Sequence, residues 1–506
     1  MPAITAYERE SEALRPERAL HALPDVAAML NAGRPGLAVK AIRAHLRDHP
    51  FDTGPRFYLV DALLRANHPE PAVKESNALL KMVPKNPVFR AQKASTLQAI
   101  GDYDGAAALW RGIVEEGEVP PECWLRFGHV LRGLGDTAEA VKAYRQAIAL
   151  DPAFGQAWWT LADLKTFRFS ADDIAAMEKT LEHAAQENRV AIHFALGKAL
   201  GDEKRYEESF AHYAKGNALH RGAIQHDPAL LGAYVARCRE AFTPEFMRAR
   251  ANAGCESRDP IFIVGMMRAG STLLEQMLAS HSQIEGTKEL TDLMMAAREI
   301  QAKLGPTYPR GIETVDPAEF KRVGERYLET TRAYRKTAKP HFLDKMGANF
   351  AHVGLIALLL PNAKIIDMRR HPMACGFSNF AQLFAQGQNN TYRLSDIGQL
   401  YRDYVALMAH FDRAIPGKVH RVFYEDLVAD PEKELRRLFA YLELPFEEAC
   451  LAFHNTKRVV ATVSSEQVRQ PIHGNAVEQW KHYEPWLEPL KTALGPVLDT
   501  YPDVPA

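Results

Sequence analysis

A repeat of 34 residues is the feature that most constrains the first part of this 506-residue chain. Residues that tolerate a tight turn recur once in each period, and an alanine follows each of them by five residues. The turn positions are Gly33, Asn67, Gly101 and Gly135, and the alanines are Ala38, Ala72, Ala106 and Ala140. Glycine and asparagine accept the backbone of a tight turn, and alanine lets neighbouring helices approach closely. The period therefore predicts a stack of helix–turn–helix units.

Prolines follow the same period at Pro50, Pro84 and Pro152, with Glu118 at the remaining slot. Proline ends a helix and starts a connection, so these positions are expected to close the second helix of each unit. Over about residues 20–165 the pattern resembles the tetratricopeptide repeat. Arrays of this kind form concave surfaces that bind peptides or proteins. The resemblance implies either a protein partner for the repeats or a structural scaffold for the neighbouring domain.

The periodicity weakens after the repeats and then changes character. A weaker unit with helically spaced aromatic residues is predicted at 206–219, and a short strand rich in branched residues follows Pro260. A chain of 506 residues also exceeds one ordinary hydrophobic core. We therefore predict three parts, which are a helical repeat domain over residues 1–240, a linker over 241–257 and an α/β domain over 258–495.

The composition excludes a general attraction to polyanions. The formal net charge is −1 at pH 7, so no global field draws the chain to nucleic acid or to an anionic membrane. The five cysteines are scattered and form no CxxC motif, which argues against a zinc site or a disulfide framework. The N-terminal residues lack the apolar core of a secretory signal, and Leu355–Leu360 is too short a stretch to span a membrane. We therefore expect a cytoplasmic protein.

The segment after Pro260 has the pattern of a phosphate-binding loop. An apolar strand is predicted at 261–265, and after a short loop Gly270 precedes a predicted helix. Backbone N–H groups converge at such a helix start, and the helix dipole favours an anion. A Walker A motif would place a lysine after Gly270, but Ser271 stands there and Arg268 lies inside the loop. A P-loop phosphotransferase therefore stays only an alternative.

This loop resembles the phosphosulfate loop of the sulfotransferase family, which usually reads PRSGTT or PRSGST. The likeness extends over about residues 258–490 and is nearest to bacterial repeat-containing sulfotransferases and the tyrosylprotein branch. It implies an α/β three-layer domain with a mostly parallel sheet. It also implies metal-free transfer of a sulfuryl group from 3′-phosphoadenosine 5′-phosphosulfate (PAPS) to an acceptor hydroxyl. The residues then expected to hold the 5′-phosphosulfate are Arg268, Ala269, Gly270, Ser271 and Thr272.

A second motif follows a predicted strand that ends in Arg369 and Arg370, with Ser378 eight residues after the second arginine. A guanidinium offers a fork of donors to phosphate oxygens, and a hydroxyl can complete the cradle. In sulfotransferases an arginine and a serine at this spacing hold the 3′-phosphate, the group that distinguishes PAPS from ATP. The resemblance implies this role for Arg370 and Ser378. Arg369 is the less certain neighbour, with pairing to a carboxylate as its other interpretation.

Further roles rest on the same resemblance. Glu289 matches the catalytic base of the tyrosylprotein branch, with Glu285 as a nearby rival. Lys345 is expected to stabilise the negative charge that grows as the sulfur–oxygen bond breaks. Ser464 matches a serine that contacts the reacting sulfate, and Tyr424 is expected to border the adenine or the 3′-phosphate.

Three positions depart from the family pattern, which are Met267, Gly347 and Gln479. Proline usually precedes the loop arginine and follows the lysine–methionine pair, and a basic residue usually precedes Trp480. These departures keep open a catalytically degenerate chain that serves as a repeat-based protein-binding module. The acceptor is equally open, because a protein or peptide tyrosine is suggested by analogy and carbohydrate or small-molecule alcohols remain alternatives.

Overall fold

The computed structural model describes residues 6–287, 289–385, 387–456, 467–472 and 474–503. The chain forms two compact units, one made of Met1–Leu161 with Ala175–Asn188 and the other of Ala162–Ile174 with Arg189–Ala506. The domain limits expected from the sequence, with a linker at 241–257, stay a prediction. No helix among the described residues combines the length and the apolar character needed to cross a membrane.

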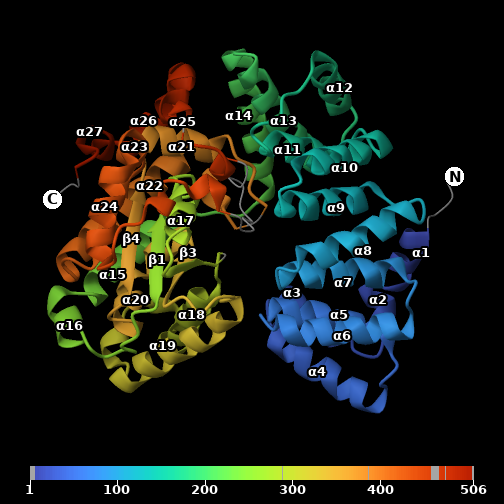
Figure 1. The fold of residues 1–506 in the computed structure, drawn as a ribbon, viewed down its shortest axis with the longest axis horizontal. Helices are drawn as coiled ribbons and strands as arrows, with labels where there is room; N and C mark the ends of the chain where they lie inside the picture. Colours follow the sequence, from blue (N-terminus) through green and yellow to red (C-terminus); the bar gives the residue numbers. More distant parts are fainter. Residues whose placement is uncertain (1–5, 288, 386, 457–466, 473, 504–506) are drawn as a thin grey trace. The chain divides into compact units, whose positions relative to one another are not determined.

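The first unit is built from helices alone. They are α1 (Ala6–Ala13), α2 (Pro16–Ala19), α3 (Pro24–Asn31), α4 (Pro35–Asp48), α5 (Thr53–Arg65), α6 (Pro69–Met82), α7 (Pro87–Ala99), α8 (Tyr103–Glu115), α9 (Pro121–Leu134) and α10 (Thr137–Leu150) (Figure 1). Helices α11 (Gly155–Asp163), α12 (Ala171–Leu181) and α13 (Gln186–Asp202) each run across a limit between the two units.

The tight turns expected from the period are present. Gly33, Asn67, Gly101 and Gly135 have φ angles of 67°, 60°, 81° and 86°, which is the left-handed region that glycine and asparagine accept most easily. Each alanine that follows them is 0% exposed, so its small side chain lies where two helices meet. The sequence period thus reports a real helix–turn–helix repeat.

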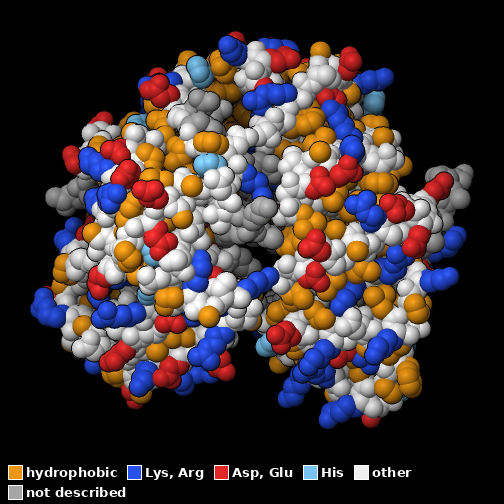
Figure 2. Space-filling model, viewed as in Figure 1, with side chains coloured by type: hydrophobic (Ala, Val, Ile, Leu, Met, Phe, Trp, Pro, Cys, Tyr) orange, Lys and Arg blue, Asp and Glu red, His pale blue; other side chains and the backbone are white. Residues whose placement is uncertain are grey.

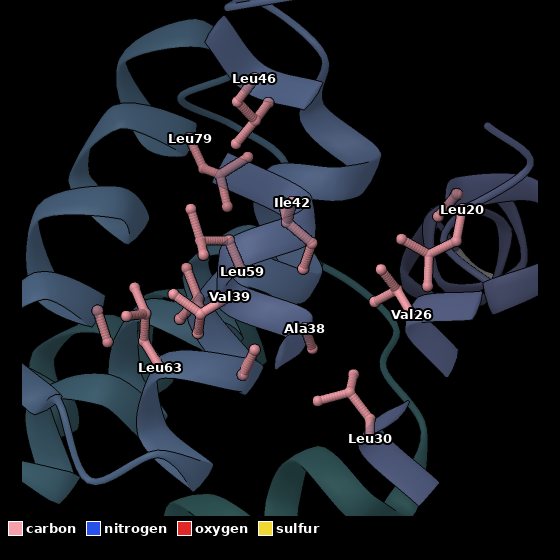
Figure 3. Packing of buried hydrophobic residues seen from close by; sticks show 14 of the residues in the cluster. Leu20, Val26, Leu30, Ala38, Val39, Ile42, Leu46, Leu59, Leu63 and Leu79 are labelled. Atoms are coloured by element: carbon pink, nitrogen blue, oxygen red, sulfur yellow. The ribbon is translucent and has the colours of Figure 1, made fainter. Parts of the chain in front are cut away.

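The core of the first repeats consists of aliphatic side chains that face one another across the helix pairs. Figure 3 shows Val39 and Ile42 of α4, Leu59 and Leu63 of α5 and Leu79 of α6 in one cluster of buried side chains. These side chains are all 9% exposed or less. Because each helix has only one apolar stripe, a unit cannot bury that stripe alone and is stabilised by its neighbours.

The second unit contains a parallel sheet of five strands. The strands are β1 (Pro260–Gly265), β2 (Ile284–Gly286), β3 (His341–Lys345), β4 (Lys364–Arg369) and β5 (Val419–Phe423). Their order is β2-β3-β1-β4-β5, and every neighbouring pair is parallel. Strands β3, β1 and β4 are drawn side by side in Figure 1. The central strand β1 is buried along its whole length, which its apolar sequence predicts.

Helices cover this sheet and continue beyond it. They are α14 (Tyr206–Ala223), α15 (Ala229–Ala241), α16 (Pro244–Ala249), α17 (Ser271–Ala279), α18 (Asp292–Leu304), α19 (Pro317–Thr331), α20 (Val353–Leu359), α21 (Pro372–Phe380), α22 (Leu394–Ala414), α23 (Tyr424–Ala429), α24 (Pro431–Leu442), α25 (Asn475–Glu478), α26 (Glu488–Leu494) and α27 (Pro496–Thr500). The expected α/β architecture with a parallel sheet is therefore confirmed.

Helix α14, predicted as a weaker repeat, packs inside the second unit. Its Ser209 hydroxyl lies 3.0 Å from the Tyr483 hydroxyl, and its Asn217 amide donates to the Phe380 carbonyl at 2.8 Å. The Phe210 ring also stacks on Trp486, with 5.7 Å between the ring centroids. Helix α14 thus supports α21 and the segment that follows residue 478.

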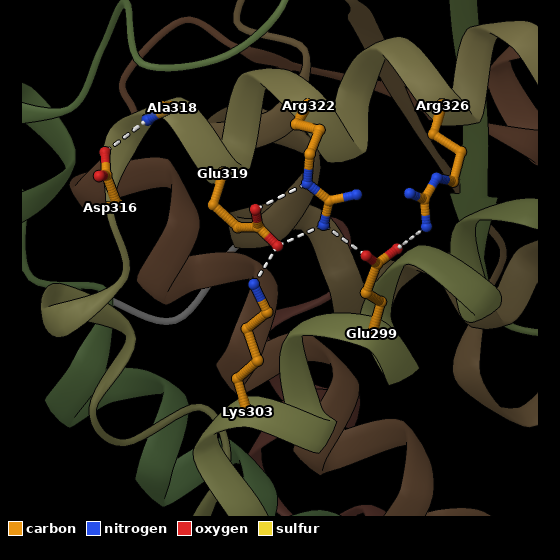
Figure 4. A network of polar contacts seen from close by, with 7 residues as sticks. All are labelled: Glu299, Lys303, Asp316, Ala318, Glu319, Arg322 and Arg326. Atoms are coloured by element: carbon orange, nitrogen blue, oxygen red, sulfur yellow. Dashed lines mark hydrogen bonds and ion pairs between the residues drawn. The ribbon is translucent and has the colours of Figure 1, made fainter.

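Charged side chains fasten α18 to α19 at the surface (Figure 4). Glu319 accepts from Arg322 on its own helix and from Lys303 on α18, and these contacts lower the pKa of the Glu319 carboxyl to about 2. On the face shown in Figure 2, Lys and Arg side chains are interspersed with Asp and Glu, in keeping with the net charge of −1.

Candidate functional site

The loop between β1 and α17 needs glycine at both ends. Gly265 has a φ of 138°, and a Cβ on it would lie 2.4 Å from the Met368 carbonyl oxygen of the neighbouring strand. Gly270 has a φ of 101°, and a Cβ on it would lie 2.4 Å from the ring of Tyr424. The loop therefore lies tightly against β4 and α23, and its backbone enters α17 in the manner of an anion-binding helix start.

The first helix after β4 holds this loop in place. The Asn379 side-chain amide donates to the Met267 carbonyl at 2.8 Å, and the Cys375 thiol donates to the same oxygen at 3.3 Å. Both donors are 0% exposed on α21. Met267 stands where the family usually has proline, and its carbonyl has buried partners that fix the loop backbone.

Arg268 and Arg370 approach each other at the carboxyl ends of β1 and β4. The Arg370 Nη1 donates to the Arg268 carbonyl at 3.0 Å, and the Arg268 Nε donates to the Ser378 Oγ at 3.3 Å. The Arg370 guanidinium also lies over the Tyr424 ring, 5.0 Å from its centroid. Four residues predicted separately from three motifs thus lie within one constellation.

The neighbouring Arg369 points elsewhere, because successive side chains of a strand alternate between the two faces of the sheet. It is 2% exposed, and its Nε donates to the Asp367 carboxylate at 3.1 Å. The Tyr404 hydroxyl donates to the same carboxylate. Arg369 therefore has the structural ion pair that was its other interpretation, and Arg370 is the arginine of the site.

The carboxylates after α17 also divide into two roles. Glu289 accepts from the Lys345 ammonium at 2.5 Å, and its own side chain is 52% exposed. Glu285, the rival base, is 6% exposed and accepts from the backbone N–H groups of Lys336 and Thr337 at 2.5 and 3.0 Å. Glu285 thus joins two chain segments and is turned away from the site. The Lys345 Nζ lies 3.7 Å from Glu275 as well.

These residues surround a cavity of about 1070 Å³ whose described lining lies entirely in the second unit. Its volume is slightly above that of most single-ligand pockets, which is roughly 300–1,000 Å³, so it has room for more than one small ligand. The predicted site residues that line it are Arg268, Gly270, Ser271, Thr272, Glu289, Arg370, Ser378 and Tyr424. Ala269 and Lys345 are buried just behind the lining, and Ser464 lies outside the described residues.

The electrostatics of the cavity favour an anion. Six of its described lining side chains are Lys or Arg, and three are Asp or Glu. Burial lowers the pKa of the Arg268 guanidinium, and nearby Arg370 lowers it further, while Asp163 opposes this change. A cation in such surroundings is stabilised when a negatively charged ligand replaces the lost water. The described residues contain no group of three or more His, Cys, Asp or Glu that could hold a metal ion.

The two other departures from the family pattern also lie at the cavity. A Cβ on Gly347 would lie 2.7 Å from the Gly265 carbonyl oxygen, so this glycine permits close contact with the start of the loop. Gln479 lines the cavity as a neutral side chain, and Lys481 pairs with Glu478 at 2.5 Å instead of lining it.

Sequence reasoning missed one wall of the cavity. Lys165 and Arg168 from the segment after α11 line it, as do Lys198 and Tyr206 of α13 and α14. These residues precede the α/β region and follow no motif. The one available signal was the run of basic residues where the repeat pattern stops, and basic residues alone are usually solvated surface.

Comparisons with known proteins give the same division of the chain. Residues 260–448 match the sulfotransferase family, and residues 121–164 match the tetratricopeptide repeat. An uncharacterized protein of Aquifex aeolicus (strain VF5) is 32% identical over 394 residues, which cover 74% of this chain and 51% of that protein. A protein-tyrosine sulfotransferase of Drosophila melanogaster is 24% identical over 266 residues, which cover 48% of this chain and 52% of that protein. The chain thus spans about half the length of these two relatives.

Among solved structures, the sulfotransferase domain from the Synechococcus PCC 7002 olefin synthase is similar to part of the chain. It is 24% identical with a TM-score of 0.35, and the match covers 45% of this chain and 88% of that domain.

Proposed function

We propose that this protein transfers a sulfuryl group from PAPS to an acceptor hydroxyl, in keeping with the match of residues 260–448 to the sulfotransferase family. The observation that carries the proposal is the convergence of Arg268, Arg370 and Ser378 on one cavity beside the glycine loop. Two strand ends with separate guanidinium groups suit a nucleotide that carries two separate anionic groups.

The residues present fit such a donor. Arg370 is 8% exposed, and its Nε has no hydrogen-bond partner among the described residues. A buried donor of this kind is costly unless a ligand accepts from it. In the proposed complex Arg370 and Ser378 hold the 3′-phosphate, and the Gly270 loop with Ser271 and Thr272 holds the 5′-phosphosulfate. Tyr424 is then the ring that supports the Arg370 guanidinium.

The donor supplies an activated sulfuryl group, and the chain supplies the proton acceptor and the charge. The proposed acceptor hydroxyl gives its proton to a Glu289 oxygen while its own oxygen bonds to sulfur. The bond between sulfur and the phosphate oxygen breaks, and 3′-phosphoadenosine 5′-phosphate leaves. Lys345 donates to Glu289 and so fixes the carboxylate, and its charge also stabilises the departing oxygen from behind the loop. Ser464 stays a predicted contact of the sulfate.

The acceptor class proposed here is a protein or peptide tyrosine, presented by or near the tetratricopeptide repeats. Its support is the similarity to a protein-tyrosine sulfotransferase and the exposure of Glu289, which leaves the base open to a bulky substrate. A phosphotransferase is disfavoured, because the residue after Gly270 is Ser271 instead of the lysine that contacts β- and γ-phosphates.

Calorimetry with 3′-phosphoadenosine 5′-phosphate tests the donor assignment. We expect Arg370→Ala to weaken binding at least about tenfold, since a buried charged donor is lost. Lys481→Ala is the matched control, because this exposed cation does not itself line the cavity and is expected to leave affinity unchanged. Equal affinity in wild type and Arg370→Ala would refute the assignment. A wild type that binds no such nucleotide would favour the protein-binding module instead.

A further inference from the structure

One wall of the cavity comes from residues that precede the sulfotransferase match in the sequence. This wall, which we call the basic wall, consists of Lys165, Arg168, Lys198 and Lys204. All four residues precede residue 260, where the family match begins, yet they belong to the same compact unit as the sheet. Lys165 and Lys198 are partly buried and are therefore candidates for ligand contacts that the family region alone does not provide, whereas Arg168 and Lys204 are exposed.

Within the basic wall, Lys165 has neighbours on the segments that carry the groups already assigned to the donor. Its Nζ donates to the Gln382 Oε1 at 3.1 Å and lies 3.3 Å from the Asp163 carboxylate. The Gln382 Nε2 donates to the same carboxylate at 3.0 Å. Gln382 is 1% exposed and lies two residues beyond the end of α21, the helix that carries Ser378.

The local charges leave an excess of cations around Lys165. Arg268 and Lys198 are near enough to disfavour its charged form, and Asp163 favours that form. Burial is the largest effect, and the result is a Lys165 pKa lowered to about 8. Its side chain is nevertheless 20% exposed where it lines the cavity. A dianionic ligand placed here would offset the mutual repulsion of Lys165, Arg268 and Arg370.

We propose that Lys165 is a further nucleotide-binding residue, whose ammonium group contacts the 3′-phosphate beside Ser378. The inference rests on the proposed function. In this proposal the segment between α11 and α12, which carries Lys165, completes the donor site. Nucleotide binding then depends on residues outside the sulfotransferase match. The alternative position for Lys165, on the acceptor, is less favoured because its neighbour Arg268 donates to the Ser378 hydroxyl.

The test compares two nucleotides on the full chain by calorimetry, 3′-phosphoadenosine 5′-phosphate and adenosine 5′-phosphate. The ratio of their affinities measures the contribution of the 3′-phosphate. We expect Lys165→Met to lower this ratio at least about tenfold and Lys165→Arg to preserve most of it. Lys204→Met is a close control, because Lys204 lines the same cavity with a similar φ of 63° against 64° for Lys165, but is exposed.

A pH series provides a second readout should Lys165→Met fail to fold. The charged groups that face Lys165 are Asp163 on its own segment, Arg268 on the loop and Lys198 on α13. Above pH 7 the phosphate charge is nearly constant, since its second pKa is about 6. The ratio of the two nucleotide affinities in wild type should therefore fall as pH rises through about 8. In Lys165→Arg the same ratio should stay constant over this pH range.

Each outcome has a distinct meaning. An unchanged ratio in Lys165→Met, or equal losses for both nucleotides, would overturn the assignment of Lys165 while leaving the Arg370 result intact. An effect confined to the KM of the acceptor would overturn it as well and place Lys165 on the other substrate. A wild type that binds neither nucleotide would overturn the proposed function and this inference together.

Discussion

Gly270→Ala is the substitution that probes the phosphate loop most directly. The new methyl group would lie 2.4 Å from the Tyr424 ring and 3.0 Å from the Met368 side chain, at a residue whose φ is 101°. The left-handed backbone costs a residue with a Cβ about 1–2 kcal/mol. Displacing packed neighbours costs about 1–3 kcal/mol more. We therefore expect a loss of about 2–5 kcal/mol in the stability of the second unit.

The same methyl group should also weaken nucleotide binding, because the Tyr424 ring carries the Arg370 guanidinium on its face. Moving the ring moves the cation away from its bound position, and we expect an affinity for 3′-phosphoadenosine 5′-phosphate at least about tenfold lower. Thermal unfolding with and without this nucleotide is a suitable assay. Only the unit that binds the ligand is stabilised by it, so its transition can be recognised in a chain with two units.

For a unit of this size, with an unfolding entropy of about 2.1 cal/mol/K per residue, the expected stability loss corresponds to a midpoint lower by about 3–7 °C. Gly222→Ala is the matched control, since a Cβ at Gly222 meets nothing within 4 Å and the residue lies within α14. That control should unfold at or slightly above the wild-type midpoint. A Gly270→Ala protein with wild-type midpoint and affinity would refute the close packing of the loop against Tyr424.

Two further predictions concern single carboxylates. Glu289→Gln should lower sulfuryl transfer by about 10²–10⁴-fold while leaving nucleotide affinity within about twofold, and an active Glu289→Gln enzyme would place the base elsewhere. Glu319 has its pKa lowered to about 2 by Arg322 and Lys303, so its ionised form stabilises the folded state at pH values above the ordinary 4.5. The stability advantage of wild type over Glu319→Gln should be constant at neutral pH and disappear as pH falls from 4.5 toward 2, as chemical denaturation can measure. An advantage that persists at pH 2 would contradict the ion pairs at Glu319.

The repeat turns and the phosphate loop were predictable for the same physical reason. Both need a backbone that few residues adopt, so Gly135 and Gly270 mark them in the sequence without any knowledge of distant contacts. The meeting of Arg268 with Arg370 followed from a second general rule. In a parallel sheet the carboxyl ends of neighbouring strands lie at one edge, and β1 pairs with β4.

The sequence alone could not show which of two neighbouring candidate residues lies at the cavity. Arg369 and Arg370 differ in function because a strand directs them to opposite faces, and only the assembled sheet shows which face has the cavity. Glu285 and Glu289 differ because the backbone of Lys336 reaches the first of them from a segment about fifty residues away. Local patterns contain no information about such long-range partners.

The basic wall shows the same limit at the scale of a whole segment. Lys165 and Gln382 are 217 residues apart in sequence, and the repeat period that precedes Lys165 describes only how helices follow one another. Packing determines which apolar residues a terminal helix contacts, and the Phe210 ring of α14 stacks on Phe380 and Trp486. The repeat period therefore predicts where helices follow one another, whereas packing determines which compact unit a helix belongs to. In this chain the cavity lining depends on packing, because Lys165 lies before the α/β region and still contacts Gln382, which follows β4.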